Sequence, residues 1–156
     1  MATQAVTLRS ADARDIGAVD RLMADAFDPR WGEAWTRNQC LGVLAMAGVR
    51  LTVAEVDDEP AGFALVRRVL DEEELLLLAV ARAHRRRGVG RALLRAVIAD
   101  AQGAGMAKLH LEVRSGNPAV GLYAGQGFEK TGEKRGYYRG TAGEPHDAHS
   151  YSLSLA

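Results

Sequence analysis

The sequence predicts an α/β fold in which a mixed β-sheet carries helices on both faces. Three observations lead to this prediction. An apolar run at residues 75–80 leads through a basic, glycine-containing turn into an amphipathic helix. Two strand-like segments flank the turn residues 57–60, which predicts an antiparallel hairpin. Residues 108–113 alternate between apolar and polar side chains, as a strand with one buried face does.

The composition predicts one domain, spanning residues 1–156, without repeats or an inter-domain linker. Twenty basic and twenty acidic side chains cancel, so nucleic acid and anionic membranes are not expected partners. The amino-terminal residues lack a signal-peptide pattern, and no apolar run is long enough to span a bilayer. Cys40 is the only cysteine and is expected to be a small core residue. A protein of the cytoplasm, without an intrachain disulfide, is therefore expected.

The first half of the chain predicts a strand at 5–9, two helices and a hairpin. Asp12 can cap the first helix, which Pro29 and Gly32 end, and a less regular helix precedes Gly48. The apolar positions of the first helix recur at helical spacing and are Ile16, Val19, Met23 and Phe27. Strands at 49–56 and 61–69 form the hairpin, and the next strand, Leu75 to Ala81, is apolar without alternation, as if buried on both faces.

The second half predicts a helix at 89–102, a strand at 108–113, a short helix from Pro118 to Gln126 and a closing pair of strands. In the strand at 108–113, His110 and Glu112 share the polar face. The closing strands lie near 128–135 and 149–155, separated by a glycine-rich loop that holds Tyr137, Tyr138 and Gly140.

The turn Arg85-Arg86-Arg87-Gly88-Val89-Gly90 predicts a phosphate-binding site. The first amides of a helix lack intrahelical partners and point outward, and the glycines let a ligand approach the backbone. Residues 82–95 contain six arginines and no acidic residue. The turn matches neither the Walker pattern nor Gly-x-Gly-x-x-Gly, which argues against nucleoside triphosphates and dinucleotides. The alternative is a basic turn that only caps the helix.

The spacing Arg85-x-x-Gly88-x-Gly90 resembles the acyl-CoA pyrophosphate loop of the GNAT superfamily of N-acetyltransferases. Leu111-Glu112-Val113-Arg114 and the segment 122–128 resemble that superfamily's later strand and helix. The resemblance implies a single-domain GNAT fold: a mostly antiparallel sheet whose central parallel pair splays apart, with acetyl-CoA in the gap. The cofactor contacts that it implies are Leu78, Ala79, Val80, Arg85, Arg86, Arg87, Gly88, Val89, Gly90, Arg91 and Asn117, with the Val80 amide polarising the thioester carbonyl.

Acetyl transfer to an amine needs a base for the amine and an acid for the departing thiolate. Glu112 is the candidate base, and its alternative role is that of an ordinary surface glutamate. Tyr123 is the candidate acid, because a phenol with a pKa of about 10 keeps its proton at neutral pH; its alternative role is packing. His110 could relay a proton but stays outside the catalytic set. No histidine or cysteine spacing indicates a metal.

Within the superfamily, the segments 74–80, 111–114 and 135–138 look most like the ribosomal-protein alanine N-acetyltransferases, the RimI type. This resemblance implies an N-terminal α-amine of a protein as acceptor, with Glu112 as base, Tyr123 as acid and Tyr138 in substrate binding. The stretch from Asn117 to Tyr123 is one residue shorter than the family pattern. One residue turns a helix by about 100°, so Asn117 keeps its family role only if the helix start absorbs the change.

Two alternatives remain open at the level of function. The loops at 29–38 and 136–145 can vary freely, so a GNAT enzyme that acetylates a small amine or a lysine is the first alternative. The second is an acyl-CoA-binding sensor without turnover. Either a monomer or a homodimer is compatible with the sequence.

Overall fold

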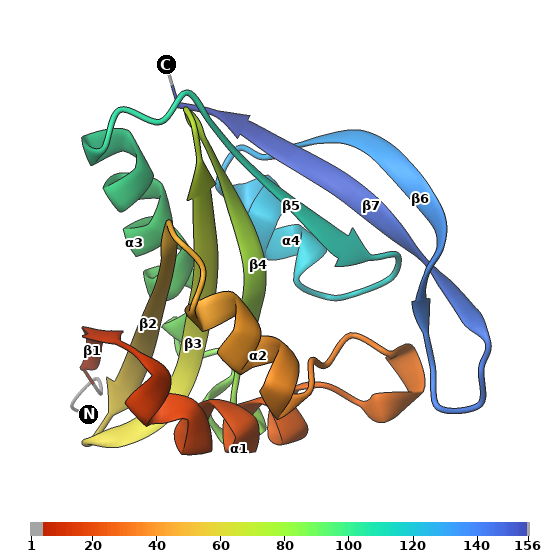
Figure 1. Ribbon diagram of the computed structural model, residues 1–156, viewed down its shortest axis with the longest axis horizontal. Helices are drawn as coiled ribbons and strands as arrows, with labels where there is room; N and C mark the ends of the chain where they lie inside the picture. The colour runs from red at the N-terminus through yellow and green to blue at the C-terminus, as the bar shows by residue number, and fades with distance from the viewer. Residues whose placement is uncertain (1–4, 156) are drawn as a thin grey trace.

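The computed structural model describes residues 5–155, so residues 1–4 and 156 of the expected domain lie outside it (Figure 1). These residues form a seven-stranded sheet in the order β1-β2-β3-β4-β5-β7-β6. The strands are β1 Val6–Ala11, β2 Val49–Val56, β3 Glu59–Val69, β4 Glu72–Val80, β5 Lys108–Arg114, β6 Glu129–Arg139 and β7 Pro145–Ser154. Neighbouring strands pair antiparallel except β4 and β5, which are parallel. The expected mixed, mostly antiparallel sheet is confirmed.

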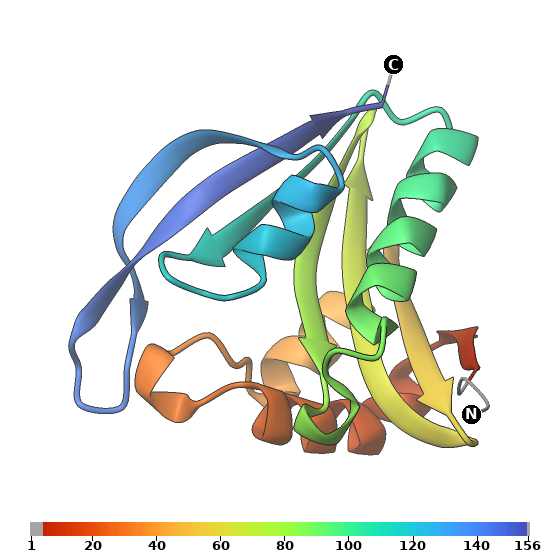
Figure 2. The same cartoon turned by 180° about the vertical axis from the view of Figure 1, so that it is seen from behind.

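Helices cover both faces of the sheet. The α-helices are α1 Ile16–Ala26, α2 Arg37–Leu44, α3 Val89–Gly103 and α4 Val120–Gly125, and three short 3-10 helices are η1 Ala13–Asp15, η2 Pro29–Trp31 and η3 Arg82–His84. Helices α1 and α2 lie on one face, and α3 and α4 lie on the other (Figures 1 and 2). Each face has its own buried cluster, built around Phe63 on the α1 side and around Leu93 and Leu94 on the α3 side.

Local signals in the first half of the chain act as expected. The Asp12 carboxylate accepts a hydrogen bond from the Arg14 amide (2.9 Å) and caps η1, which leads directly into α1. Cys40 is 1% exposed and lies in the core. The hairpin turn is tighter than expected: Asp57 and Asp58 both have positive φ, at 52° and 61°, and a two-residue turn of this kind lets β3 begin earlier than the expected residue 61.

Strand β4 packs against the core on both faces of the sheet, as expected, but its burial alternates along the strand. Its side chains alternate between buried and half-buried, and a register shift leaves Leu76 without a partner between the pairs Leu65↔Leu77 and Val66↔Leu75. Such a β-bulge reverses which face successive side chains occupy. Leu75 accordingly packs in the α3-side cluster and Leu77 in the α1-side cluster.

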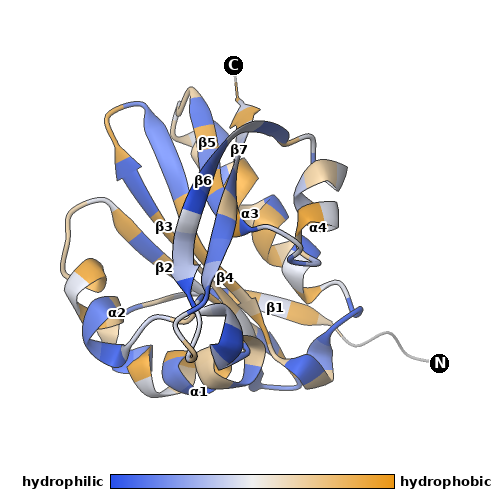
Figure 3. Cartoon of the chain, turned by 90° about the vertical axis from the view of Figure 1, so that its right-hand side faces the viewer, coloured by the Kyte–Doolittle hydropathy of each residue, from blue (hydrophilic) through white to orange (hydrophobic). Residues whose placement is uncertain are grey.

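The carboxyl-terminal part differs from the expected boundaries. The expected loop around Tyr137 and Tyr138 is wrong, because both residues belong to β6, where Tyr138 pairs with His146 of β7. Only residues 140–144 connect the two strands. The strand expected near 128–135 is therefore present but continues to Arg139. Strand β6 is largely hydrophilic and forms the sheet edge (Figure 3), which is why the sequence does not distinguish its last residues, 136–139, from a polar loop.

The central strands separate after a short paired segment. Strands β4 and β5 pair only from Glu72↔Lys108 to Leu75↔Leu111. Beyond this point they diverge (Figure 1), while β5 stays paired with β7 over its whole length, from Lys108 to Arg114. The expected splayed pair is therefore present, and it starts beside the bulge in β4.

Candidate functional site

A cavity of about 930 Å³ occupies the opening between β4 and β5. Its volume lies within the range typical of small-molecule sites. Of the residues assigned from the sequence to cofactor, catalysis and acceptor, those that line it are Leu78, Ala79, Val80, Arg85, Arg86, Gly88, Val89, Gly90, Arg91, Glu112, Asn117, Tyr123 and Tyr138. Arg87 is the exception, because its side chain is exposed and does not line the cavity.

One end of the cavity is formed by the amino terminus of α3. Gly88 caps the helix with a φ of +81° and no side-chain cap, and the helical hydrogen bonds begin with Ala92 donating to the Gly88 carbonyl (2.9 Å). The amides of the first turn therefore point out of the helix. A Cβ at Gly88 would meet no atom within 4 Å, whereas a Cβ at Gly90 would lie 3.3 Å from the Leu122 side chain. Gly88 thus faces open space, and Gly90 permits close packing against α4.

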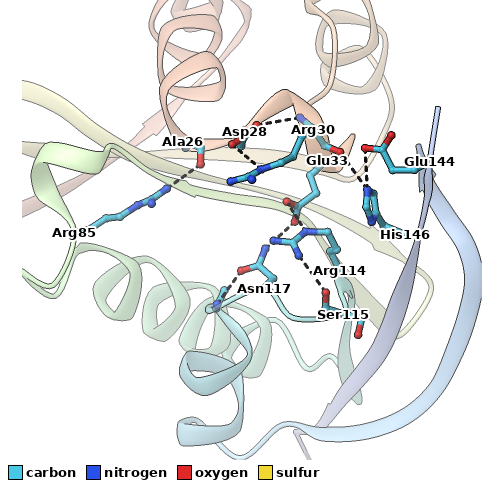
Figure 4. A network of polar contacts seen from close by, with 11 residues as sticks. Ala26, Asp28, Arg30, Glu33, Arg85, Arg114, Ser115, Asn117, Glu144 and His146 are labelled. Carbon is cyan, nitrogen blue, oxygen red and sulfur yellow. Dashed lines mark hydrogen bonds and ion pairs between the residues drawn. The ribbon is translucent and has the colours of Figure 1, made fainter. Parts of the chain in front are cut away.

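The arginine side chains of this turn only partly act as expected. The Arg85 guanidinium donates to the Ala26 carbonyl at 2.8 Å (Figure 4), and Arg82 donates its Nε to the Asp25 carbonyl at 2.9 Å. Both arginines tie the turn to the end of α1. The positive charge stays in the cavity wall, but the Arg85 side chain is held by the protein rather than aimed freely at a ligand.

The edge of β4 presents backbone amides to the cavity. The Ala81 amide donates to the Ala61 carbonyl of β3 at 2.8 Å. Because amides alternate in direction along a strand, those of Leu78 and Val80 point the other way, toward the side where β5 has diverged. This is the orientation that the expected role of the Val80 amide requires.

Glu112 lies at the opposite end of the cavity on the face of β5 that carries α1 and α2. Its Oε2 accepts a hydrogen bond from the Ser150 hydroxyl at 2.7 Å, and its Oε1 lies 2.8 Å from Lys134 Nζ. The hydrogen bond to this carboxylate raises the pKa of Lys134. The Ser150 hydroxyl and the Lys134 ammonium therefore fix the Glu112 carboxylate, which is not freely solvated.

Tyr123 lies on α4 and is only 6% exposed, with its ring edge-to-face against Phe128 at 5.9 Å between centroids. Burial, and then the negative charge of Glu33, raise the pKa of Tyr123 above its usual value. Burial and Glu33 also raise the pKa of Tyr138, with a smaller contribution from Glu112. Both phenols therefore keep their protons at neutral pH.

The sequence analysis missed the centre of a buried polar network (Figure 4). Glu33, in the loop between α1 and α2, accepts from Arg114 Nε at 3.0 Å and from Asn117 Nδ2 at 2.7 Å. The Arg114 guanidinium also lies 4.1 Å from the centre of the Trp31 ring. No sequence signal identifies this network, because Glu33 and Arg114 are 81 residues apart.

The network also reaches the start of α4 through Asn117. The Asn117 side-chain oxygen accepts from the Ala119 amide at 2.8 Å, and α4 begins only at Val120 rather than at the expected Pro118. Tyr123, in the second half of α4, lines the cavity. Asn117 holds Glu33 and the start of α4 together.

The loop around η2 touches the β6–β7 hairpin, and both segments contribute residues to the cavity lining, among them Trp31 and Tyr138. A Cβ at Gly32 would overlap the Arg139 carbonyl, and a Cβ at Gly140 would overlap the Arg30 carbonyl. His146 of β7 also reaches the Arg30 carbonyl at 3.1 Å (Figure 4). This part of the cavity is therefore bounded by two segments that are distant in sequence.

Within residues 5–155, no three histidine, cysteine, aspartate or glutamate side chains gather as a metal site. None of the helices in this range is long and apolar enough to cross a membrane.

Comparisons with known proteins agree with this geometry. Residues 16–128 match the model of the acetyltransferase (GNAT) family. The chain is 43% identical over 84 residues to the [ribosomal protein bS18]-alanine N-acetyltransferase of Escherichia coli K12, an alignment covering 53% of this chain and 57% of that relative. The enzyme of the same name from Haemophilus ducreyi is 34% identical over 105 residues, 67% of this chain and 72% of that one.

Solved structures give the same result over nearly the whole chain. The ribosomal-protein-S18-alanine N-acetyltransferase from Escherichia coli superposes with a TM-score of 0.86 at 30% identity, covering 97% of this chain and 95% of that one. Ard1 from Thermoplasma volcanium superposes with a TM-score of 0.83 at 26% identity, covering 97% and 99%. The chain spans little more than half the length of the first curated relative, but almost all of the solved structures.

Proposed function

The chain belongs to the acetyltransferase (GNAT) family, and from this premise we propose that it transfers acetyl from acetyl-CoA to the N-terminal α-amine of a ribosomal protein. The observation that carries the proposal is one continuous cavity. It joins the outward-pointing amides at the start of α3 to Glu112 and Tyr123, the two side chains suited to proton transfer. The whole chain would act as a single N-acetyltransferase domain.

The residues at the basic end fit acetyl-CoA. The amides around Gly88 suit a diphosphate, and Arg86 and Arg91 line the same part of the cavity. The amides of Leu78 and Val80 can hydrogen-bond an extended chain that lies along β4. In this arrangement the Val80 amide polarises the thioester carbonyl, and the reacting carbon lies in the opening between β4 and β5.

Glu112 serves as the base for the acceptor. An α-ammonium has a pKa of about 8, compared with about 10.4 for a lysine side chain, so a single carboxylate suffices to free the nucleophile near neutrality. The amine attacks the thioester carbon directly. Tyr123 then gives its proton to the departing thiolate, which its raised pKa permits because the phenol is still protonated at that stage.

Two observations support a protein terminus as the acceptor. The curated relatives described above are named for this reaction on bS18. The acceptor end is bounded by the η2 loop and the β6–β7 hairpin, and carboxylates of Glu33, Glu74 and Glu112 line it. Carboxylate oxygens at this end can accept hydrogen bonds from the ammonium group of a chain terminus.

A peptide panel tests the acceptor. Peptides with a free amino-terminal alanine should be acetylated, and the same peptides with a blocked α-amine should not. Equal turnover of blocked peptides that contain lysine, or of small amines alone, would move the assignment to the first alternative. Acetyl-CoA binding without acetylation of any amine would indicate the sensor. Intact-mass analysis of ribosomal proteins incubated with the enzyme and acetyl-CoA then identifies the acceptor.

A further inference from the structure

Glu112 borders two cavities, not one. The first is the large cavity described above, and the second is a polar hollow of about 190 Å³ on the sheet surface. Besides Glu112, its charged and polar lining residues are Glu72, Lys108, His110, Thr131, Ser150 and Ser152, and Lys108 lies 3.9 Å from Glu72. A volume of this size holds about six water molecules at liquid density. Glu112 therefore separates the proposed reaction centre from a site that water can fill.

Two side chains hold Glu112 in that position. Lys134, from β6, contacts one carboxylate oxygen at 2.8 Å, and the Ser150 hydroxyl, from β7, donates to the other at 2.7 Å. The side chain of Glu112 is 17% exposed and that of Lys134 is 52% exposed. Solvent screens a pair this open, so it adds little to the stability of the fold. Its effect is to fix the direction of the carboxylate.

We propose that Lys134 and Ser150 are positioning residues that hold Glu112 between the two cavities, so that the acceptor's proton leaves through the small one. This inference rests on the proposed function. An acceptor ammonium gives one proton to Glu112, which passes it to water in the small cavity. Tyr123 gives its own proton to the thiolate and recovers one from the attacking nitrogen. The balance is one ammonium and one thioester in, and one amide, one thiol and one solvent proton out.

The other charged and titratable groups near Glu112 come from several elements. Electrostatic interactions with Tyr137 of β6 and Glu74 of β4 add to the raised pKa of Lys134. The charge of Glu112 contributes to the raised pKa of Tyr138 of β6. His110 lies two residues before Glu112 on the same face of β5. Among these groups, Lys134 is the cation in direct contact with the carboxylate.

The first test replaces the lysine. Lys134→Met should lower kcat about fivefold and move the acidic limb of the pH profile of kcat/KM to higher pH, because the carboxylate loses its neighbouring cation. Lys134→Arg should restore both. Lys130→Met is the matched control, because Lys130 lies on the same strand and pairs with Glu133 at 2.6 Å. A Lys134→Met enzyme with the parent kcat and the parent pH profile would overturn the proposal.

The second test addresses the serine and the route. Ser150→Ala should lower kcat about threefold to fivefold with an unchanged Kd for acetyl-CoA, and Ser150→Thr should recover the loss. Ser154→Ala, on the exposed end of the same strand, is the control. Ser152→Leu fills the small cavity and should lower kcat while raising the solvent deuterium isotope effect. Parent kinetics in a folded Ser152→Leu enzyme would exclude this exit for the proton.

The Glu112→Gln variant distinguishes a failure of the proposed function from a failure of the positioning inference alone. If this variant keeps full activity, Glu112 is not the base, and both the proposed mechanism and the positioning inference are wrong. If Glu112→Gln is inactive while the Lys134 and Ser150 variants match the parent, the base assignment survives and only the inference fails. Thermal unfolding of every variant shows whether a loss of activity reflects a loss of fold.

Discussion

The two proposed catalytic side chains work in opposite environments. Tyr123 is enclosed by the core, where burial and the charge of Glu33 hold its proton. Glu112 faces two cavities and is held by Lys134 and Ser150. An acid that keeps its proton beside a base that stays charged is the arrangement that transfer from a thioester to an amine requires.

Removal of the Tyr123 hydroxyl tests its role as acid. Tyr123→Phe keeps the ring and its packing against Phe128, so the fold and acetyl-CoA binding should be preserved. We expect kcat to fall about 100-fold, because the thiolate loses its proton donor. Steady-state kinetics together with a calorimetric Kd for acetyl-CoA measure the two effects. A variant that works at the parent rate would exclude the assignment.

The raised pKa of Tyr123 also predicts an alkaline loss of stability. Above pH 10 the unfolded chain loses the phenolic proton while the folded protein keeps it, so stability falls as pH rises. One such group contributes a slope of about 1.4 kcal/mol per pH unit. Between pH 9 and 11, where the unfolded phenol is only partly ionised, urea denaturation should show a total loss of stability that is smaller by about 1.4 kcal/mol in Tyr123→Phe. Equal losses would mean that the phenol titrates normally in the folded state.

Two elements position the ligand: the bulged strand β4 and the helix α3. The bulge at Leu76 lies beside Leu75, the last residue of β4 that pairs with β5, so the strand changes its facing side where the sheet opens. After the bulge, Leu78 and Val80 of the same strand line the cavity. Gly88 then starts α3 with its amides toward the same cavity.

A glycine comparison tests the helix start. Gly88→Ala should weaken acetyl-CoA binding at least tenfold, because the turn loses its left-handed conformation at a cost of about 1–2 kcal/mol and the side chain faces the ligand. Gly105→Ala is the control. It follows the other end of α3, has a φ of +75° and also has no neighbour within 4 Å of a Cβ. The control should lose similar stability but bind acetyl-CoA normally. Equal affinities in both variants would contradict the proposal that the amides at the start of α3 bind the diphosphate of acetyl-CoA.

The molecule as a whole consists of two sheet halves that meet through the four paired positions of β4 and β5. The core cluster on the α3 side also spans both halves, and a polar connection is the buried network of Glu33, Arg114 and Asn117, which joins the loop after α1 to β5 and α4 (Figure 4). Contacts between the η2 loop and the β6–β7 hairpin complete this connection. The two sheet halves are therefore connected on each side of the opening proposed for the ligand.

Loss of Arg114 should weaken the connection made by the buried Glu33 network and lower the stability of the fold. Arg114→Met leaves the Glu33 carboxylate buried without its cation, and removal of one partner from such a pair costs about 3 kcal/mol. Arg50→Met is the control, because Arg50 and Asp100 are 3.8 Å apart and half exposed. It should change stability by less than about 0.5 kcal/mol. Chemical denaturation measures the free energy of unfolding of both variants. Equal values for Arg114→Met and Arg50→Met would show that the network does not stabilise the fold.

The sequence by itself determined the features that depend on local spacing. Helical periodicity located α1 and α3, alternation located β5, and the glycine turn located the start of α3, because each signal lies within a few neighbouring residues. Glu112 and Tyr123 were singled out by the resemblance of the segments 111–114 and 122–128 to the GNAT superfamily. Arg87 was assigned with its neighbours because spacing alone does not show which side chains of a turn face the cavity.

Only the tertiary structure decided the features that depend on contacts between distant segments. The bulge at Leu76 arises from the register with β3, the polar strand β6 exists because β7 pairs with it, and Asn117 finds its role in contact with Glu33. None of these partners is a neighbour along the chain. Local propensities fix what a segment can form, but the energy that selects register, burial and partner comes from packing and hydrogen bonds across the fold.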